Sequence, residues 1–224
     1  VGSTITVTIS YTDGQSTAES STSAATAAVA NVNDAPALAI TGTATEDQTL
    51  TANLTDADVL PAANAITWKW MRTSGGSTAD IGGATAATYV LTQADVGSTI
   101  TVNAQYTDVQ TTAENVTSAA TAAVANVNDN PTGGVTISGT ATQGQTLTAA
   151  NTLADADGLG NITYQWKRTS GGSTTNISGA TSSTYVLTQA EVGSTITVNA
   201  VYTDVQGTAE NVTSAATSAV ENVN

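Results

Sequence analysis

The hexapeptide Val-Gly-Ser-Thr-Ile-Thr stands at residues 1–6, 96–101 and 192–197. Its copies begin 96 − 1 = 95 and 192 − 96 = 96 residues apart, and the tripeptide Asn-Val-Asn recurs from Asn31, Asn126 and Asn222 with the same two offsets. A period of about 95 residues is too long for a solenoid turn or a propeller blade, and it fits an independent β-sandwich of about 100 residues. The sequence therefore predicts a tandem array of small domains.

Within each repeat, apolar and polar residues alternate with the period of a half-buried strand. In the stretch 99–106 the side chains of Ile100, Val102 and Tyr106 are expected to face inward. Trp68 and Trp70 share a face of an earlier strand, and Trp70 takes the place of the core tryptophan of an immunoglobulin-like sandwich. About seven short strands per repeat are expected, the last of them over 118–124. The prediction is an all-β chain of tandem immunoglobulin-like β-sandwich domains of about 95 residues in an elongated array.

The repeat offsets also predict the domain boundaries. Residues 37–131 and 132–224 each form a complete immunoglobulin-like repeat, and residues 1–36 match only the C-terminal part of a preceding one. A register that begins at Val1 would instead leave residues 192–224 as the remainder.

Composition excludes several classes of function. The 224 residues include 18 Asp and Glu against 4 Lys and Arg, for a net charge of −14, with no Cys and no His. Thiol and imidazole chemistry are therefore impossible, and the acidic chain repels nucleic acid. No apolar run approaches the roughly 18 residues of a membrane helix, so no membrane insertion is expected. Asp56 and Asp58 lie two apart on one loop and cannot flank a glycosidic bond, so we expect no enzyme.

Acidic and amide residues gather where one repeat ends and the next begins. The segments 31–36 (NVNDAP) and 126–131 (NVNDNP) are followed by the Asp-Ala-Asp tripeptides 56–58 and 155–157. This arrangement resembles that of cadherins, and the whole chain is similar to the tandem immunoglobulin-like and cadherin-like repeats of giant bacterial surface adhesins of the RTX type. The resemblance implies an extracellular or cell-surface extender segment that supports cell adhesion or biofilm formation.

The resemblance also implies Ca²⁺ between neighbouring repeats. Carboxylates, amide oxygens and backbone carbonyls are the ligands that Ca²⁺ prefers. The cadherin Asp-Arg-Glu motif is absent, which implies fewer ligands, and turn formation is the structural alternative for these residue types. The recurring Asp13, Asp108 and Asp204 and the recurring Glu19, Glu114 and Glu210 are additional candidates. The main candidate ligands are Asn33, Asp34, Asp56, Asp58, Asn128, Asp129, Asp155 and Asp157.

Two other functions stay open at this point. The partial repeat 1–36 supplies strands without partners of their own, which favours a self-assembling fibre or sheath built by strand addition between copies of the chain. An exposed Trp68 beside Lys69 would instead favour a glycan-binding module. The expected partners are neighbouring repeats of the same chain and, for the fibre, other copies of it.

Overall fold

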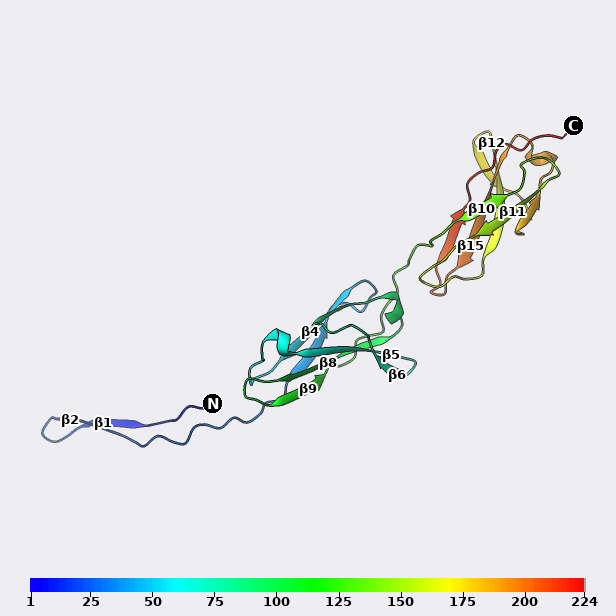
Figure 1. The fold of residues 1–224 in the computed structure, drawn as a ribbon. Coiled ribbons are helices and arrows are strands. Elements are labelled where there is room, and N and C mark those ends of the chain that lie inside the picture. Colours follow the sequence, from blue (N-terminus) through cyan, green and yellow to red (C-terminus); the bar gives the residue numbers. More distant parts are fainter. Residues whose placement is uncertain (224) are drawn as a thin grey trace. The chain divides into compact units, whose positions relative to one another are not determined.

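The computed structural model describes residues 1–223, so Asn224, the last residue of the second predicted repeat, lies outside the described residues. The chain divides into two compact units, Val1–Ala125 and Asn126–Asn224. Each unit contains one β-sandwich, and the first also contains a separate hairpin (Figure 1). The repeat boundaries expected at residues 36 and 131 stay predictions. Within residues 1–223, the helices are too short to cross a bilayer.

The sandwich of the first unit consists of seven strands in two antiparallel sheets. One sheet has the order β3-β4-β7 and the other the order β6-β5-β8-β9, and two short 3₁₀ helices join strands. The elements are β3 (Ala37–Thr41), β4 (Thr49–Thr55), η1 (Ala63–Ala65), β5 (Thr67–Ser74), β6 (Ser77–Asp80), β7 (Thr88–Val90), η2 (Gln93–Asp95), β8 (Thr99–Thr107) and β9 (Ala113–Thr117).

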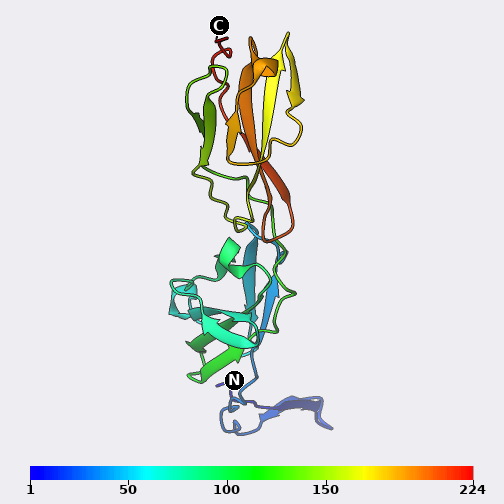
Figure 2. The same ribbon diagram turned by 90° about the vertical axis from the view of Figure 1, so that its right-hand side faces the viewer.

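The sandwich of the second unit repeats this topology. Its sheets have the orders β10-β11-β14 and β13-β12-β15-β16, and the strands can be followed in the turned view of Figure 2. The all-β prediction with seven strands per complete repeat is therefore confirmed. The elements are β10 (Val135–Ser138), β11 (Thr146–Asn151), β12 (Thr163–Ser170), β13 (Ser173–Asn176), β14 (Thr184–Val186), η3 (Gln189–Glu191), β15 (Thr195–Thr203) and β16 (Ala209–Thr213).

The core of each sandwich is built around one tryptophan on its third strand. Trp70 on β5 is fully buried, its indole Nε1 donates to the Ala86 carbonyl at 2.9 Å, and its ring lies 5.7 Å from that of Tyr89. The hydrogen bond removes the cost of burying the indole N–H, so the whole side chain stabilises the core. Trp166 makes the same bond to the Ser182 carbonyl. The predicted role of both tryptophans as core residues is confirmed.

The prediction of a last strand over 118–124 is wrong. The last strand of the first sandwich is β9, and the chain beyond it bonds to β8 at every third residue instead of every second: the N–H groups of Ser118 and Thr121 donate to the carbonyls of Val102 and Ile100. The Oγ atoms of Ser118 and Thr121 accept from the N–H groups of Val102 and Ile100. Short hydroxyl side chains thus replace backbone carbonyls, and no regular ladder forms.

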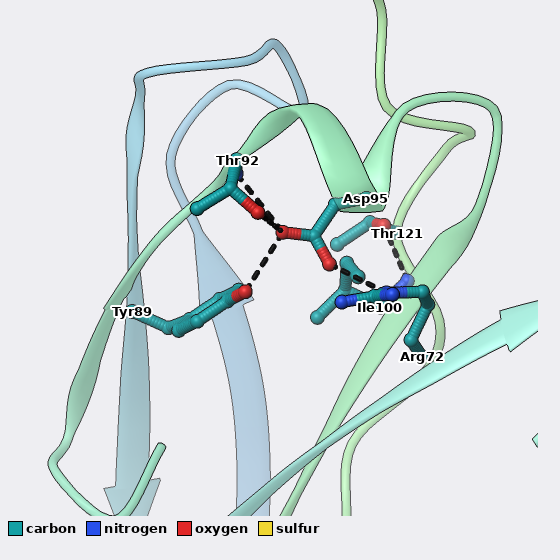
Figure 3. A network of polar contacts seen from close by, with 6 residues as sticks. All are labelled: Arg72, Tyr89, Thr92, Asp95, Ile100 and Thr121. Atoms are coloured by element: carbon teal, nitrogen blue, oxygen red, sulfur yellow. Dashed lines mark hydrogen bonds and ion pairs between the residues drawn. The ribbon is translucent and has the colours of Figure 1, made fainter. Parts of the chain in front are cut away.

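A buried carboxylate joins the two sheets of the first sandwich (Figure 3). One oxygen of Asp95 accepts from Tyr89 and Thr92, and the other lies 2.7 Å from the Arg72 Nε. Burial raises the pKa of Asp95, but the hydrogen bonds from Thr92, Tyr89 and Arg72 outweigh it and hold the pKa below its ordinary value. Glu191 forms the corresponding network with Thr188, Tyr185 and Arg168.

We predict that Asp95→Asn lowers the melting midpoint by roughly 10 °C at neutral pH, because Arg72 and Tyr89 lose a charged partner inside the protein. The pKa of Asp95 is lower in the folded protein than in the unfolded chain. Ionised Asp95 therefore stabilises the fold at pH values above the unfolded pKa of 3.8, and this stabilisation is lost as the pH falls from 3.8 through the lower folded pKa. Thermal melts between pH 2 and pH 7 test this. In the control, Asp80→Asn, an exposed carboxylate, should shift the midpoint little; an equal shift in both variants would contradict the prediction.

Candidate metal centre

A hydrogen bond from a buried tyrosine holds the Asp-Ala-Asp loop of the first sandwich against β8. The hydroxyl of Tyr106 donates to Oδ2 of Asp56, and Oδ1 of the same carboxylate accepts from the N–H of Asp58 at 2.9 Å. Desolvation by burial, followed by the hydrogen bond to Asp56, raises the pKa of Tyr106 well above its ordinary value. The phenol is therefore a permanent donor at neutral pH, and it positions the loop.

Asp108 follows the end of β8 and has one oxygen without a partner. Its Oδ1 accepts from the Thr112 N–H at 2.7 Å and closes a tight turn. Its Oδ2 is buried and has no hydrogen-bond partner among residues 1–223, and only 4% of the residue is exposed. A buried carboxylate oxygen without a partner is costly, since it has lost its hydration without compensation.

Glu114 on β9 completes a cluster of three carboxylates. Asp56, Asp108 and Glu114, which we call the acidic loop cluster, bring one oxygen each within 4.8 Å of one another. Like charges so close repel one another in a partly buried place. Among residues 1–223, Lys69, Arg72 and Arg168 form ion pairs with Asp80, Asp95 and Glu191, so three of the four basic side chains are paired elsewhere.

The segment that precedes the sandwich is tied to the same place. The N–H of Asp34 donates to Oδ2 of Asp58 at 2.7 Å, and Nδ2 of Asn33 donates to Oε1 of Glu114 at 2.8 Å. Asp58 is itself buried. The Asn-Asp pair before β3 and the Asp-Ala-Asp loop after β4 are therefore neighbours, although 24 residues separate Asp34 from Asp58.

The second sandwich repeats the arrangement residue by residue. Tyr202 donates to Asp155 at 2.6 Å, Asp129 N–H donates to Asp157 at 2.7 Å, and Asn128 donates to Glu210 at 2.9 Å. Oδ1 of Asp204 accepts from the Thr208 N–H, while its buried Oδ2 has no hydrogen-bond partner in the described part of the chain. The negative charges of Asp155, Glu210 and Asp204 all raise the pKa of Tyr202, after the larger effects of burial and of the Asp155 hydrogen bond.

These residues fit a hard divalent cation. The donors are carboxylate oxygens, which suit Ca²⁺ or Mg²⁺, and a soft metal would need the nitrogen or sulfur ligands that a chain without His and Cys lacks. A cation beside the acidic loop cluster would pair the orphan Oδ2 of Asp108 and offset the repulsion among the three carboxylates. Ca²⁺ takes six to eight oxygen ligands, so backbone carbonyls or water would supply the remainder.

The structure groups the sequence-predicted residues differently from the expected set. Asp56 lies in the acidic loop cluster and Asp155 accepts the corresponding hydrogen bond from Tyr202, whereas Asp58 and Asp157 each use an oxygen to hold the N–H of Asp34 or Asp129. The eight-residue ligand set stays a prediction. Asp108, Glu114, Asp204 and Glu210, expected only as additional candidates, share the site most closely with the Asp-Ala-Asp loops. Their recurrence in register was the signal that could have ranked them higher.

The burial of Trp68 argues against the glycan-binding hypothesis. Only 8% of Trp68 is exposed, because its ring packs in the core beside Trp70. A buried indole offers no stacking platform to a sugar. The condition for the glycan-binding alternative, an exposed Trp68, is therefore not met, and Lys69 next to it pairs with Asp80 at 3.4 Å.

Comparisons with known proteins place the chain near adhesin repeats only loosely. No family model and no curated protein matches it. One similar structure is a tetra-tandem repeat in the extending region of a large adhesion protein, with 21% identity over 96% of this chain and a TM-score of 0.28. Another is a Ca²⁺-stabilized adhesin that helps an Antarctic bacterium bind ice, with 14% identity over 98% of this chain and a TM-score of 0.33. The chain spans 57% and 56% of their lengths. At these TM-scores the likeness carries no argument about this chain.

We predict that Asp56→Asn lowers the pKa of Tyr106 toward its ordinary value of 10.0, because the phenolate then no longer faces the carboxylate that opposes its ionisation. Absorbance of the phenolate during a pH titration measures this, with Tyr106→Phe identifying the signal. The control variant Asp47→Asn changes an exposed carboxylate and should leave the titration as it is. An unchanged titration in Asp56→Asn would contradict the assigned hydrogen bond.

Proposed function

We propose that this chain is a structural extender segment of a secreted or cell-surface bacterial adhesin, and that Ca²⁺ binds at the acidic loop cluster and beside the corresponding residues Asp155, Asp204 and Glu210 of the second repeat. The metal proposal rests on the buried Oδ2 of Asp108, which has no hydrogen-bond partner among residues 1–223 and belongs to a cluster of three carboxylates. The corresponding Oδ2 of Asp204 is in the same situation with respect to hydrogen bonds. The spacer role is supported by two sandwiches with one topology and one set of polar contacts.

Calcium would act on the segment that leads into each sandwich. Asn33 and Asp34 already bond to Glu114 and Asp58. A cation held by Asp56, Asp108 and Glu114 would keep Glu114 in place and so fix the chain before β3 against the loop after β4. Because an ordered segment has fewer conformations than a free one, binding would stiffen the approach to each repeat.

A spacer also explains what the molecule lacks. Trp68 and Trp70, which share one face of their strand, are both buried in the core and are not available to bind a ligand. The chain has neither the thiol nor the imidazole of the common nucleophiles and acid–base catalysts. Both similar structures are adhesins, one of them described as Ca²⁺-stabilized, but the proposal rests on the residues of this chain.

The test is a thermal melt with Ca²⁺ and with a chelator. We predict that saturating Ca²⁺, at about 100 times its dissociation constant, stabilises each sandwich by about 2.7 kcal/mol and raises its melting midpoint by roughly 10 °C or more. The double variant Asp108→Asn/Asp204→Asn should lose most of this shift, because asparagine keeps the Oδ1 acceptor of the turn and removes the charge.

Asp13 provides a matched control. It occupies the same repeat position in residues 1–36, and its Oδ1 accepts from the Thr17 N–H, but it has no counterpart of Asp56 within residues 1–36. Asp13→Asn should therefore leave the Ca²⁺ shift intact. No midpoint shift with Ca²⁺, or equal loss in the control and the double variant, would refute the metal site.

A further inference from the structure

Residues 1–29 have the same backbone hydrogen bonds as part of a complete sandwich. The N–H groups of Ser23, Thr26 and Val29 donate to the carbonyls of Val7, Ile5 and Ser3. The residues 95 positions further along the chain make the same bonds: the N–H groups of Ser118, Thr121 and Val124 donate to the carbonyls of Val102, Ile100 and Ser98. The side-chain bonds correspond as well, because the Oγ atoms of Ser23 and Thr26 accept from the N–H groups of Val7 and Ile5. The hairpin β1 (Thr8–Thr12) and β2 (Ala18–Thr22) thus has the strand pairing of β8 and β9.

The apolar side chains of this segment are exposed, whereas their counterparts are fully buried. Ile5 and Val7 are 61% and 63% exposed, and the equivalent Ile100 and Val102 are 0% exposed. The same holds for Tyr11 against Tyr106 and for Val29 against Val124. An isolated two-stranded hairpin is marginally stable, and a contiguous apolar face of this kind marks an interaction surface.

The complete sandwiches show what covers such a face. β8 pairs with β9 on one edge and with β5 on the other, and Val102 stands opposite Trp70 in that second pairing. β1 pairs only with β2 among the described strands, so its other edge is open. The groups missing around β1 are therefore those that residues 37–95 supply to β8.

The hairpin differs in side-chain size from β8 and β9 at the paired positions 9 and 21, and the larger difference is at the fully buried one, because Ser21 takes the place of the only partly buried Val116. Ala104 and Ala200 are fully buried and stand opposite the large aromatic residues Trp68 and Tyr164. The hairpin has Ile9 at this position. An isoleucine opposite a tryptophan would overpack the core, whereas exchanging the tryptophan for a small aliphatic residue nearly conserves the summed volume.

We propose that the apolar face of residues 1–30 binds the first five strands of a further repeat of this kind, and that the strand paired with β1 has a side chain smaller than Trp or Tyr opposite Ile9. Strands of a second copy are the less suitable occupant, because β5 and β12 already pair on both edges, with β6 and β8 and with β13 and β15. A second copy would first have to release one of its own strands.

The test fuses a copy of residues 37–95 directly before Val1, which recreates the junction between Asp95 and Val96. Hydrogen exchange of the amides of residues 4–12 is measured in the fused and unfused chains, and sedimentation reports the mass of each. We expect at least about 100-fold slower exchange in the fused monomer, because the edge of β1 becomes paired. Val7→Asp in the fused chain should abolish this protection.

The size rule is tested by a matched pair of substitutions. Trp68→Val in the fused copy should raise the melting midpoint of the new domain by roughly 5 °C, since it relieves the overpacking against Ile9. The same substitution in the original copy, opposite Ala104, should lower the midpoint of that sandwich, because it opens a cavity.

Two results would overturn the proposal. The first is unchanged hydrogen exchange: the amides of residues 4–12 would exchange as fast in the fused chains as in the unfused chain, whether the fused copy carries Trp68 or valine. The other is protection of the same amides in the unfused chain as it dimerises at rising concentration, which would make a second copy the occupant. A loss of stability from Trp68→Val in the fused copy would refute the size rule.

Discussion

The pairing of the third strand with the sixth is the interaction on which each sandwich depends. In the first repeat, β5 places Trp70 opposite Val102 of β8, and the strands on either side attach to this pair. The equivalent segment without that partner, residues 1–29, keeps the corresponding local hydrogen bonds and leaves Ile5 and Val7 exposed. Local bonding sets the hairpin, but burial requires the second strand, because apolar area is removed from water only when another layer covers it.

The acidic site depends on the same strand. Tyr106 on β8 is buried by the sandwich, and from there its hydroxyl holds Asp56, while Asp108 lies at the turn after β8 and Glu114 on β9. A chain with a charge of −14 has many carboxylates that need no partner, since they are solvated. Asp108 and Asp204 are distinguished by burial: each has one oxygen with no hydrogen-bond partner among residues 1–223, and the proposed Ca²⁺ site rests on these two oxygens.

Much of the fold could be predicted from single residues and their spacing. The alternation in 99–106 predicted β8 with Ile100 and Val102 inside, and the repeat offsets predicted two equivalent sandwiches. The end of the last strand was predicted wrongly. The Ala-rich segment 118–124 lacks the amphipathic pattern of a helix and was therefore expected to be a strand, yet the hydroxyl oxygens of Ser118 and Thr121 accept the hydrogen bonds that backbone carbonyls accept in a regular ladder. The site was predicted only in part, since Asp34, Asp56 and Asp58 are near in sequence while Asp108 and Glu114 come from the far end of the repeat.

The sequence by itself determined the period, the β pattern and the recurrence of the acidic residues of the candidate site, because these depend on residue type and spacing. The tertiary structure alone decided which carboxylates meet and which hairpin is uncovered. Asp56 and Asp108 become neighbours only when β4 and β8 pack in facing sheets. Ile5 and Ile100 have identical local sequences and opposite burial, because burial is a property of what lies across the strand and not of the strand itself.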